Sequence, residues 1–156
     1  MKKIVFVMLF IVALMNSYLA MAQPCSCVDY VRNRTKLGRG GHATAWDSHL
    51  ETNGYRQVYS PQNKDIVVIK AFPNDPKICG KDPELSGTTC ANRYYGHIGL
   101  VSRAEYDNNG NLVIYIIGAN QGSRNTWSEN ECSNVSEWRY VVTPERSQYV
   151  KYYRAP

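Results

Sequence analysis

Residues 96–117 read GHIGLVSRAEYDNNGNLVIYII, two apolar segments on either side of a polar turn. Both segments are rich in aliphatic and β-branched residues, and the Asn-Gly pair between them readily adopts the positive φ that hairpin turns need. We therefore predict strands over 97–106 and 112–117, joined as an antiparallel hairpin.

The register of this hairpin decides which residue lies beside His97. A two-residue turn at Asn109-Gly110 would place His97 opposite Gly122, whereas a turn at Asn108-Asn109 would place it opposite Asn120. The sequence leaves both registers open. In either one, the segment that follows the second strand lies next to His97.

Helices are predicted before the hairpin and further strands around it. The apolar spacing predicts helices over 27–34 and 43–52, and short β-branched or aromatic runs predict strands over 65–69, 138–142 and 149–153. Helices first and strands later are typical of an α+β domain with an antiparallel sheet. We expect the N-terminal helices to pack on that sheet.

The two predicted helices have recognisable ends and buried positions. Ser26 is a suitable N-cap for the first helix, whose stripe includes Tyr30 and Val31. Trp46 belongs to the buried stripe of the second helix, and Gly54 supplies its end. We expect Tyr30 and Trp46 to be core residues.

The first 22 residues have the pattern of a cleavable signal peptide. Lys2 and Lys3 precede an apolar run over 4–14, and Ala20-Met21-Ala22 is a small-residue cleavage site. The run is shorter than the ~20 residues that a membrane span needs, so we expect no stable membrane insertion after cleavage. The expected mature chain is a single domain over 23–156, secreted or periplasmic.

The charge of the chain is mild. The formal net charge is +5, and the basic residues are scattered with no long run. Proteins that bind nucleic acid usually carry a basic stripe or patch. We therefore expect no nucleic-acid partner.

An odd number of cysteines, all beyond the expected cleavage site, indicates one cysteine that either stays a free thiol or pairs with a second chain. An oxidising compartment favours disulfides, but five cysteines cannot all pair within one chain. We favour Cys79 with Cys90, across a turn-rich stretch, and Cys25 with Cys132, which leaves Cys27 free. A disulfide at Cys27, with Cys25 or Cys132 left over, is the competing interpretation.

Three residues follow the order of a cysteine-nucleophile site. Cys27 stands at a predicted helix N-terminus, which lowers the pKa of a thiol. His97 would act as the general base, and Asn120 would orient its imidazole. Taken singly, His97 also fits a strand histidine with satisfied hydrogen bonds, and Asn120 fits a strand end or loop.

A metal site is not expected. His42 and His49 flank the second predicted helix and have the character of surface residues. Together with Cys27 they match no zinc-binding spacing. We expect neither a metal nor another cofactor.

The motifs, taken in order, resemble the CHAP domain, a family of cysteine- and histidine-dependent amidohydrolases and peptidases of bacterial cell-wall turnover. No single motif is specific, but the ordered set is. The matching segments are Cys27-x-x-Tyr30-Val31, Gly41-x-Ala43-x-x-Trp46, Pro61-x-x-Lys64-Asp65-Ile66-Val67, Gly96-His97-Ile98-Gly99-Leu100-Val101 and Asn120.

The resemblance implies a papain-like fold and hydrolysis of an amide bond in peptidoglycan. The bond would join sugar to stem peptide, as in an N-acetylmuramoyl-L-alanine amidase, or lie within the peptide, as for an endopeptidase. Cys27 would form the acyl-enzyme, His97 would transfer protons, and Asn120 would be the third member. Peptidoglycan or its peptide fragments are the implied partners.

Two positions depart from the family pattern. Gly118 stands where the family often has a glutamate, and Lys64 replaces a glycine in the turn before the first strand. The loss of the glutamate passes the third catalytic position to Asn120. It also supports an alternative function, a catalytically inactive module that binds wall fragments or a protein partner.

Overall fold

The computed structural model describes residues 25–70, 95–119, 127–129 and 132–156. Seven strands within these residues form one sheet in the order β1-β7-β2-β3-β4-β6-β5, and all neighbouring strands are antiparallel. The strands are β1 (Arg56–Val58), β2 (Ile66–Ile69), β3 (His97–Tyr106), β4 (Leu112–Ala119), β5 (Trp127–Glu129), β6 (Cys132–Val142) and β7 (Val150–Arg154). The α+β class with an antiparallel sheet is confirmed.

Helical segments precede the sheet and interrupt its last connection. They are α2 (Cys27–Thr35), the 3₁₀ helix η1 (Ala43–Ala45), α3 (Trp46–Thr52) and α4 (Pro144–Ser147). In the part of the chain described, no helix is both long and apolar enough to cross a membrane. The signal-peptide prediction lies outside the described residues.

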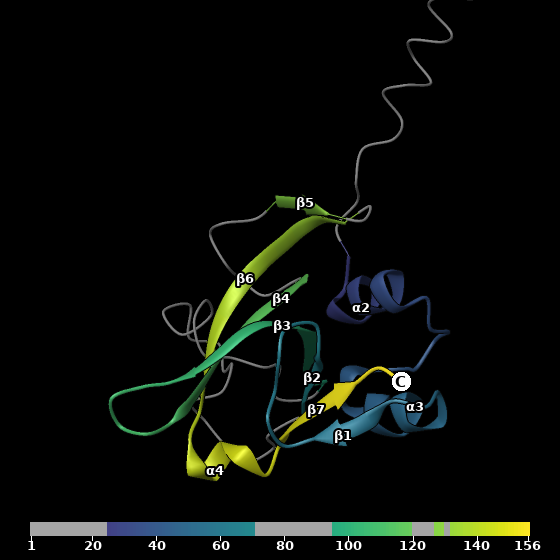
Figure 1. Cartoon of the computed structure of the whole chain (residues 1–156). Helices are drawn as coiled ribbons and strands as arrows, with labels where there is room; N and C mark the ends of the chain where they lie inside the picture. Colours follow the sequence, from purple (N-terminus) through teal and green to yellow (C-terminus); the bar gives the residue numbers. More distant parts are fainter. Residues whose placement is uncertain (1–24, 71–94, 120–126, 130–131) are drawn as a thin grey trace, which may run out of the picture.

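The sheet has two apolar faces that belong to different clusters. Figure 1 shows α2 and α3 on one side of the sheet. On that helix-covered face, Tyr30 of α2 and Trp46 of α3 are fully buried against β2 and its neighbours, as predicted for these two residues. The opposite face carries its own buried cluster, which includes Trp138, Tyr140 and Tyr152. The strands therefore alternate between two cores, as period-2 side chains require.

The hairpin turn is one residue longer than the two-residue turns that were predicted. It has three residues, because the Asp107 N–H donates to the Asn111 carbonyl (3.0 Å) and the Gly110 N–H donates to the Asp107 carbonyl (3.0 Å). Gly110 takes the positive φ of 77° that closes such a turn. The Asp107 carboxylate also accepts from the N–H groups of Asn109 and Asn111, which stabilises the longer loop.

A β-bulge beyond the turn then changes the register. The irregularity lies between Val101 and Arg103, and beyond it Val101 pairs with Ile116 and Leu100 with Ile117. This is the pairing that a two-residue turn at Asn108-Asn109 would have produced. The extra turn residue and the bulge offset each other, because each shifts the register by one residue.

Several element boundaries also differ from those predicted. The helix predicted over 43–52 begins as the 3₁₀ helix η1 before α3, and β6 starts six residues earlier than the predicted strand at 138. The first half of β6 is polar in sequence, but it pairs with β4 from Ala119 to Ile117. Tertiary pairing outweighs local propensity there. The short elements β1, β5 and α4 were not predicted.

The turn before β2 contains Lys64, one of the two departures from the family pattern. Lys64 has φ 73°, in the left-handed region that glycine occupies at low cost. The adjacent Asp65 is buried and accepts two hydrogen bonds from Arg154 of β7 (2.9 and 2.8 Å). The turn is thus held by its neighbours in a conformation that lysine adopts with strain.

Replacing Lys64 with glycine should stabilise the protein. Relief of the left-handed strain is worth about 1–2 kcal/mol, and the greater freedom of glycine in the unfolded chain offsets part of it, so we expect a gain of about 0.5–1 kcal/mol. Urea unfolding of Lys64→Gly beside Lys64→Ala checks this. The alanine variant keeps the Cβ and should show no comparable gain; an equal gain in both would assign the effect to the lysine side chain.

Candidate active site

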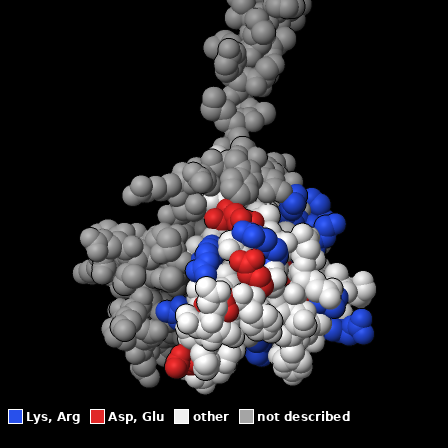
Figure 2. All heavy atoms as spheres, turned by 60° about the vertical axis from the view of Figure 1, so that its left-hand side comes forward, with Lys and Arg blue, Asp and Glu red and all other residues white. Residues whose placement is uncertain are grey.

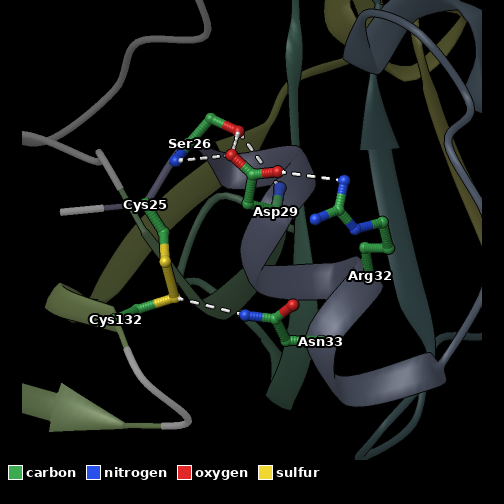
Figure 3. A network of polar contacts seen from close by, with 6 residues as sticks. All are labelled: Cys25, Ser26, Asp29, Arg32, Asn33 and Cys132. Atoms are coloured by element: carbon green, nitrogen blue, oxygen red, sulfur yellow. Dashed lines mark hydrogen bonds and ion pairs between the residues drawn. A yellow bond between two sulfur atoms is a disulfide. The ribbon is translucent and has the colours of Figure 1, made fainter. Parts of the chain in front are cut away.

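The N-terminus of α2 places Cys27 as the first residue of a capped helix. The Ser26 hydroxyl accepts a hydrogen bond from the Asp29 N–H (3.1 Å), and the Asp29 carboxylate accepts one from the Ser26 N–H (3.4 Å). This reciprocal capping box fixes the first turn, as the predicted N-cap required. Figure 3 shows it beside the ion pair from Arg32 to Asp29 (3.3 Å).

The segment just before the helix is attached to β6. Cys25 forms a disulfide with Cys132, which confirms that predicted pair. The Asn134 side chain holds the Cys25 backbone at both ends: its oxygen accepts from the Cys25 N–H (2.7 Å), and its amide donates to the Cys25 carbonyl (2.9 Å). Closing a loop of ~100 residues stabilises a fold by roughly 4–5 kcal/mol in the chain-entropy model. The predicted pair Cys79 with Cys90 lies outside the described residues.

His97 is the first residue of β3 and is 5% exposed. Its imidazole ring meets the Trp138 indole edge to face, with ring centroids 5.3 Å apart. Trp138 lies on β6 opposite Ile116, on the sheet face that the helices do not cover. The indole packing restricts the rotation of the imidazole, as a positioned general base requires.

The thiol of Cys27 lies against His97. Among the cysteines described it is the free one, and it is half-buried. Burial alone raises the pKa of a thiol, but the charge of His97 and a hydrogen bond with its side chain lower the pKa of Cys27. Backbone hydrogen bonds at Ile98 and Val28 lower it further, and the net result is a pKa below the usual value for cysteine. A nucleophilic thiolate needs this environment.

The third predicted member, Asn120, lies outside the described residues. The described part of β4 ends at Ala119, and Gly118 pairs with Ser136 of β6. Ser136 is buried, on the side of the sheet where Trp138 also lies. The position that often carries a glutamate in the family therefore has no side chain here, beside a buried serine.

The two other histidines do not join this site. His42 is exposed and stacks on Tyr95 with ring centroids 4.6 Å apart, as expected of a surface residue. His49 is half-buried, with its ring edge to face against Trp46 (centroids 5.0 Å apart), so it is less exposed than the expected surface residue. The described residues contain no cluster of three or more metal-ligating side chains.

Two residues around the site were not singled out from the sequence. Asn134 holds Cys25, and no local pattern distinguishes it from a loop asparagine. Trp138 was expected only as part of a strand, and its contact with His97 follows from a register that the sequence left open. The roles of both residues can be recognised only when the pairing of β4 with β6 is known.

A thiol of lowered pKa beside an imidazole, on an α+β scaffold, defines a site suited to nucleophilic acyl transfer. The chain belongs to the CHAP domain family, whose model matches residues 17–120. The ordered motifs from Cys27 to Asn120 had indicated this family, and the match confirms it.

Comparison with solved structures finds similarity to an N-acetylmuramoyl-L-alanine amidase from Staphylococcus aureus. The identity is 18% and the TM-score 0.48, over 84% of this chain and 30% of that one. This chain therefore spans less than a third of that structure, and the likeness does not transfer its activity. No protein of curated function matches the sequence.

The lowered pKa of Cys27 predicts how its alkylation depends on pH. A lower pKa populates the thiolate at lower pH, so iodoacetamide should modify Cys27 with a midpoint below that of an ordinary thiol. His97→Ala removes the lowering charge and hydrogen bond but keeps the burial, so its midpoint should move to higher pH. Peptide mapping by mass spectrometry at each pH identifies the modified cysteine.

His42→Ala is the matched control for this titration, because it removes an exposed histidine that stacks on Tyr95 rather than on the thiol. Its alkylation profile should equal that of the wild type. Identical midpoints in the wild type and His97→Ala would contradict the thiol–imidazole contact.

Proposed function

We propose that this protein is a secreted peptidoglycan hydrolase that cleaves an amide bond through a cysteine acyl-enzyme. The observation that carries the proposal is the contact between Cys27 and His97 at a capped helix N-terminus, in a member of the CHAP domain family. The bond is the sugar–peptide amide or a peptide bond of the stem. The scaffold needs no cofactor for this chemistry.

In the proposed reaction the Cys27 thiolate attacks the amide carbonyl carbon and forms a tetrahedral intermediate. The backbone N–H of Cys27 donates to the resulting oxyanion, because the first N–H groups of a helix have no partner within the helix. His97, protonated, gives its proton to the leaving amine, and the C–N bond breaks. Water then attacks the thioester while His97 takes its proton, which releases the acid and restores the thiolate.

Asn120 completes the proposed site by orienting the His97 imidazole, in the papain-like order of cysteine, histidine and asparagine. The support comes from the described pairs of the hairpin: Leu100 opposite Ile117 is the register in which Asn120, rather than Gly122, would stand opposite His97. Gly118 supplies no carboxylate at the position where the family often has a glutamate.

We further propose that residues 1–22 direct the chain to the exterior and that 23–156 form a single catalytic domain there. The disulfide between Cys25 and Cys132 supports an oxidising compartment, since such bonds are rare in the cytosol. The mixed charge of the surface fits a polymer substrate that is not strongly ionic. Figure 2 shows acidic and basic side chains interspersed on the face in view.

Digestion of purified peptidoglycan tests the reaction. The wild type should release soluble fragments, while Cys27→Ala and His97→Ala should each lower the rate by about a thousandfold or more, because the nucleophile and its base act as a unit. Mass spectrometry of the products identifies the bond cleaved, and His42→Ala serves as the control that keeps the activity. Equal cleavage by the wild type and both variants would contradict the assignment of Cys27 as nucleophile and His97 as base.

The third member has its own test. Asn120→Ala should lower the rate of peptidoglycan release by about tenfold to a thousandfold, because the imidazole loses the group that fixes its tautomer and tilt. Gln121→Ala is the control at the next position in the sequence, which has no role in the proposed site. Full activity of Asn120→Ala, with wild-type thermal stability, would remove Asn120 from the site.

Gly118 favours one alternative, a catalytically inactive module that binds wall fragments or a protein partner. The two functions differ in one result: the inactive module binds peptidoglycan without releasing fragments, whether or not Cys27 is present. The digestion experiment therefore separates them.

A further inference from the structure

A pocket lies at the opposite end of the long strands from Cys27. It has a volume of about 500 Å³ and is formed by β1, the β3–β4 turn, the end of β6, α4 and the start of β7. β6 begins at Cys132, close to Cys27, and ends at Val142, which lines the pocket. At ~3.3 Å per residue, the length of β6 separates the two places by roughly 30 Å. Figure 1 shows α4 at this far end, away from α2.

Two exposed aromatic rings flank this pocket. Tyr59 is 89% exposed and Tyr106 is 75% exposed, and both line it. Among the described residues only one other large apolar side chain, Tyr95, is comparably exposed. The face of an aromatic ring carries negative charge density and attracts the slightly positive C–H groups of a flat apolar surface. The apolar face of a pyranose ring is such a surface.

The polar groups of the pocket are almost all uncharged. Among the described residues that line it there is no carboxylate, and the one charged side chain, Lys151, already forms an ion pair with Asp47 at 3.0 Å. The remaining polar lining consists of amides and hydroxyls, from Gln57, Asn111, Thr143, Ser147 and Gln148. Such a lining favours a neutral ligand that can both donate and accept hydrogen bonds.

One buried hydroxyl of the pocket wall lacks a partner. Tyr152 is only 6% exposed, it lines the pocket, and its hydroxyl has no hydrogen bond within the described residues. The oxygen itself is closed off from solvent, so a ligand in the pocket cannot reach it, and Tyr152 contributes only other parts of its side chain to the pocket wall. Asn111 and Gln148 use their amide N–H groups within their own turns (3.1 and 3.2 Å), so their amide oxygens are available as acceptors.

We propose that this pocket binds a neutral glycan, with Tyr59 and Tyr106 stacking on pyranose rings and the amide oxygens of Asn111 and Gln148 accepting hydrogen bonds from sugar hydroxyls. The inference goes beyond the proposed hydrolysis and does not need Cys27 or His97. An N-acetylated wall glycan and an unmodified glucan share this chemistry, and the ligands used in the test distinguish them.

The test uses the full chain with Cys27→Ala, so that cleavage plays no part. Titration with the β-1,4-linked hexasaccharides of N-acetylglucosamine and of glucose, followed by calorimetry and by amide chemical shifts, should show saturable binding of at least one. The largest shifts should fall in the β3–β4 turn and α4. Preference between the two sugars identifies the source of the glycan.

Paired variants show whether the rings carry the binding. Adding Tyr59→Ala and Tyr106→Ala together should weaken binding by about tenfold or more, because both stacking rings are lost, whereas the matching pair of phenylalanine variants should keep it. Tyr152→Phe is the control within the pocket wall and should bind as tightly as the parent, because its hydroxyl oxygen is closed off from solvent.

Several outcomes would overturn the proposal. These are no saturation by either sugar at millimolar concentration, unchanged affinity in the double alanine variant, or shifts confined to α2 and the start of β3. Equal binding of an acidic hexasaccharide would contradict the neutral ligand class. Because only binding is measured, failure of this test does not contradict the proposed catalytic site. An inactive catalytic site, in turn, does not affect the measured binding.

Discussion

The attachment of the chain just before α2 to β6 is the interaction on which the arrangement of the site depends. A nine-residue helix is marginal by itself in water, so its position has to come from tertiary contacts. The disulfide from Cys25 to Cys132 and the paired hydrogen bonds of Asn134 supply a fixed point two residues before Cys27. The buried side chains of Tyr30 and Val31 fix the rest of the helix on the sheet.

The electrostatics of Cys27 follow from this placement. Burial works against the thiolate, and only a partner at hydrogen-bond distance reverses the effect. His97, the first residue of β3, meets that condition through its hydrogen bond with Cys27. Its imidazole also packs edge to face on Trp138, so the base contacts both an indole and a thiol.

The sequence predicted that Cys27 and His97 belong together better than it predicted the strand pairing around them. Cys27 and His97 stood out because an odd thiol at a helix start and a glycine-flanked histidine on a strand are both uncommon. The hairpin register could not be predicted, because the bulge near Ser102 compensates for the third turn residue, and a serine in a strand gives no sign of a bulge. Asn134 and the polar half of β6 were missed because only long-range pairing makes them strand residues. Asn120 stays a prediction.

The position of β7 in the sheet has a consequence for how this chain is made. Residues 150–154 form a strand that lies between β1 and β2, although about eighty residues separate β2 from it along the chain. Until those residues have been synthesised, β1 has no neighbour in the sheet and Asp65 is without Arg154. The domain therefore completes its fold only after this last strand has been synthesised, when most of the chain has already left the ribosome. That delay would suit a polypeptide that crosses a membrane before it folds.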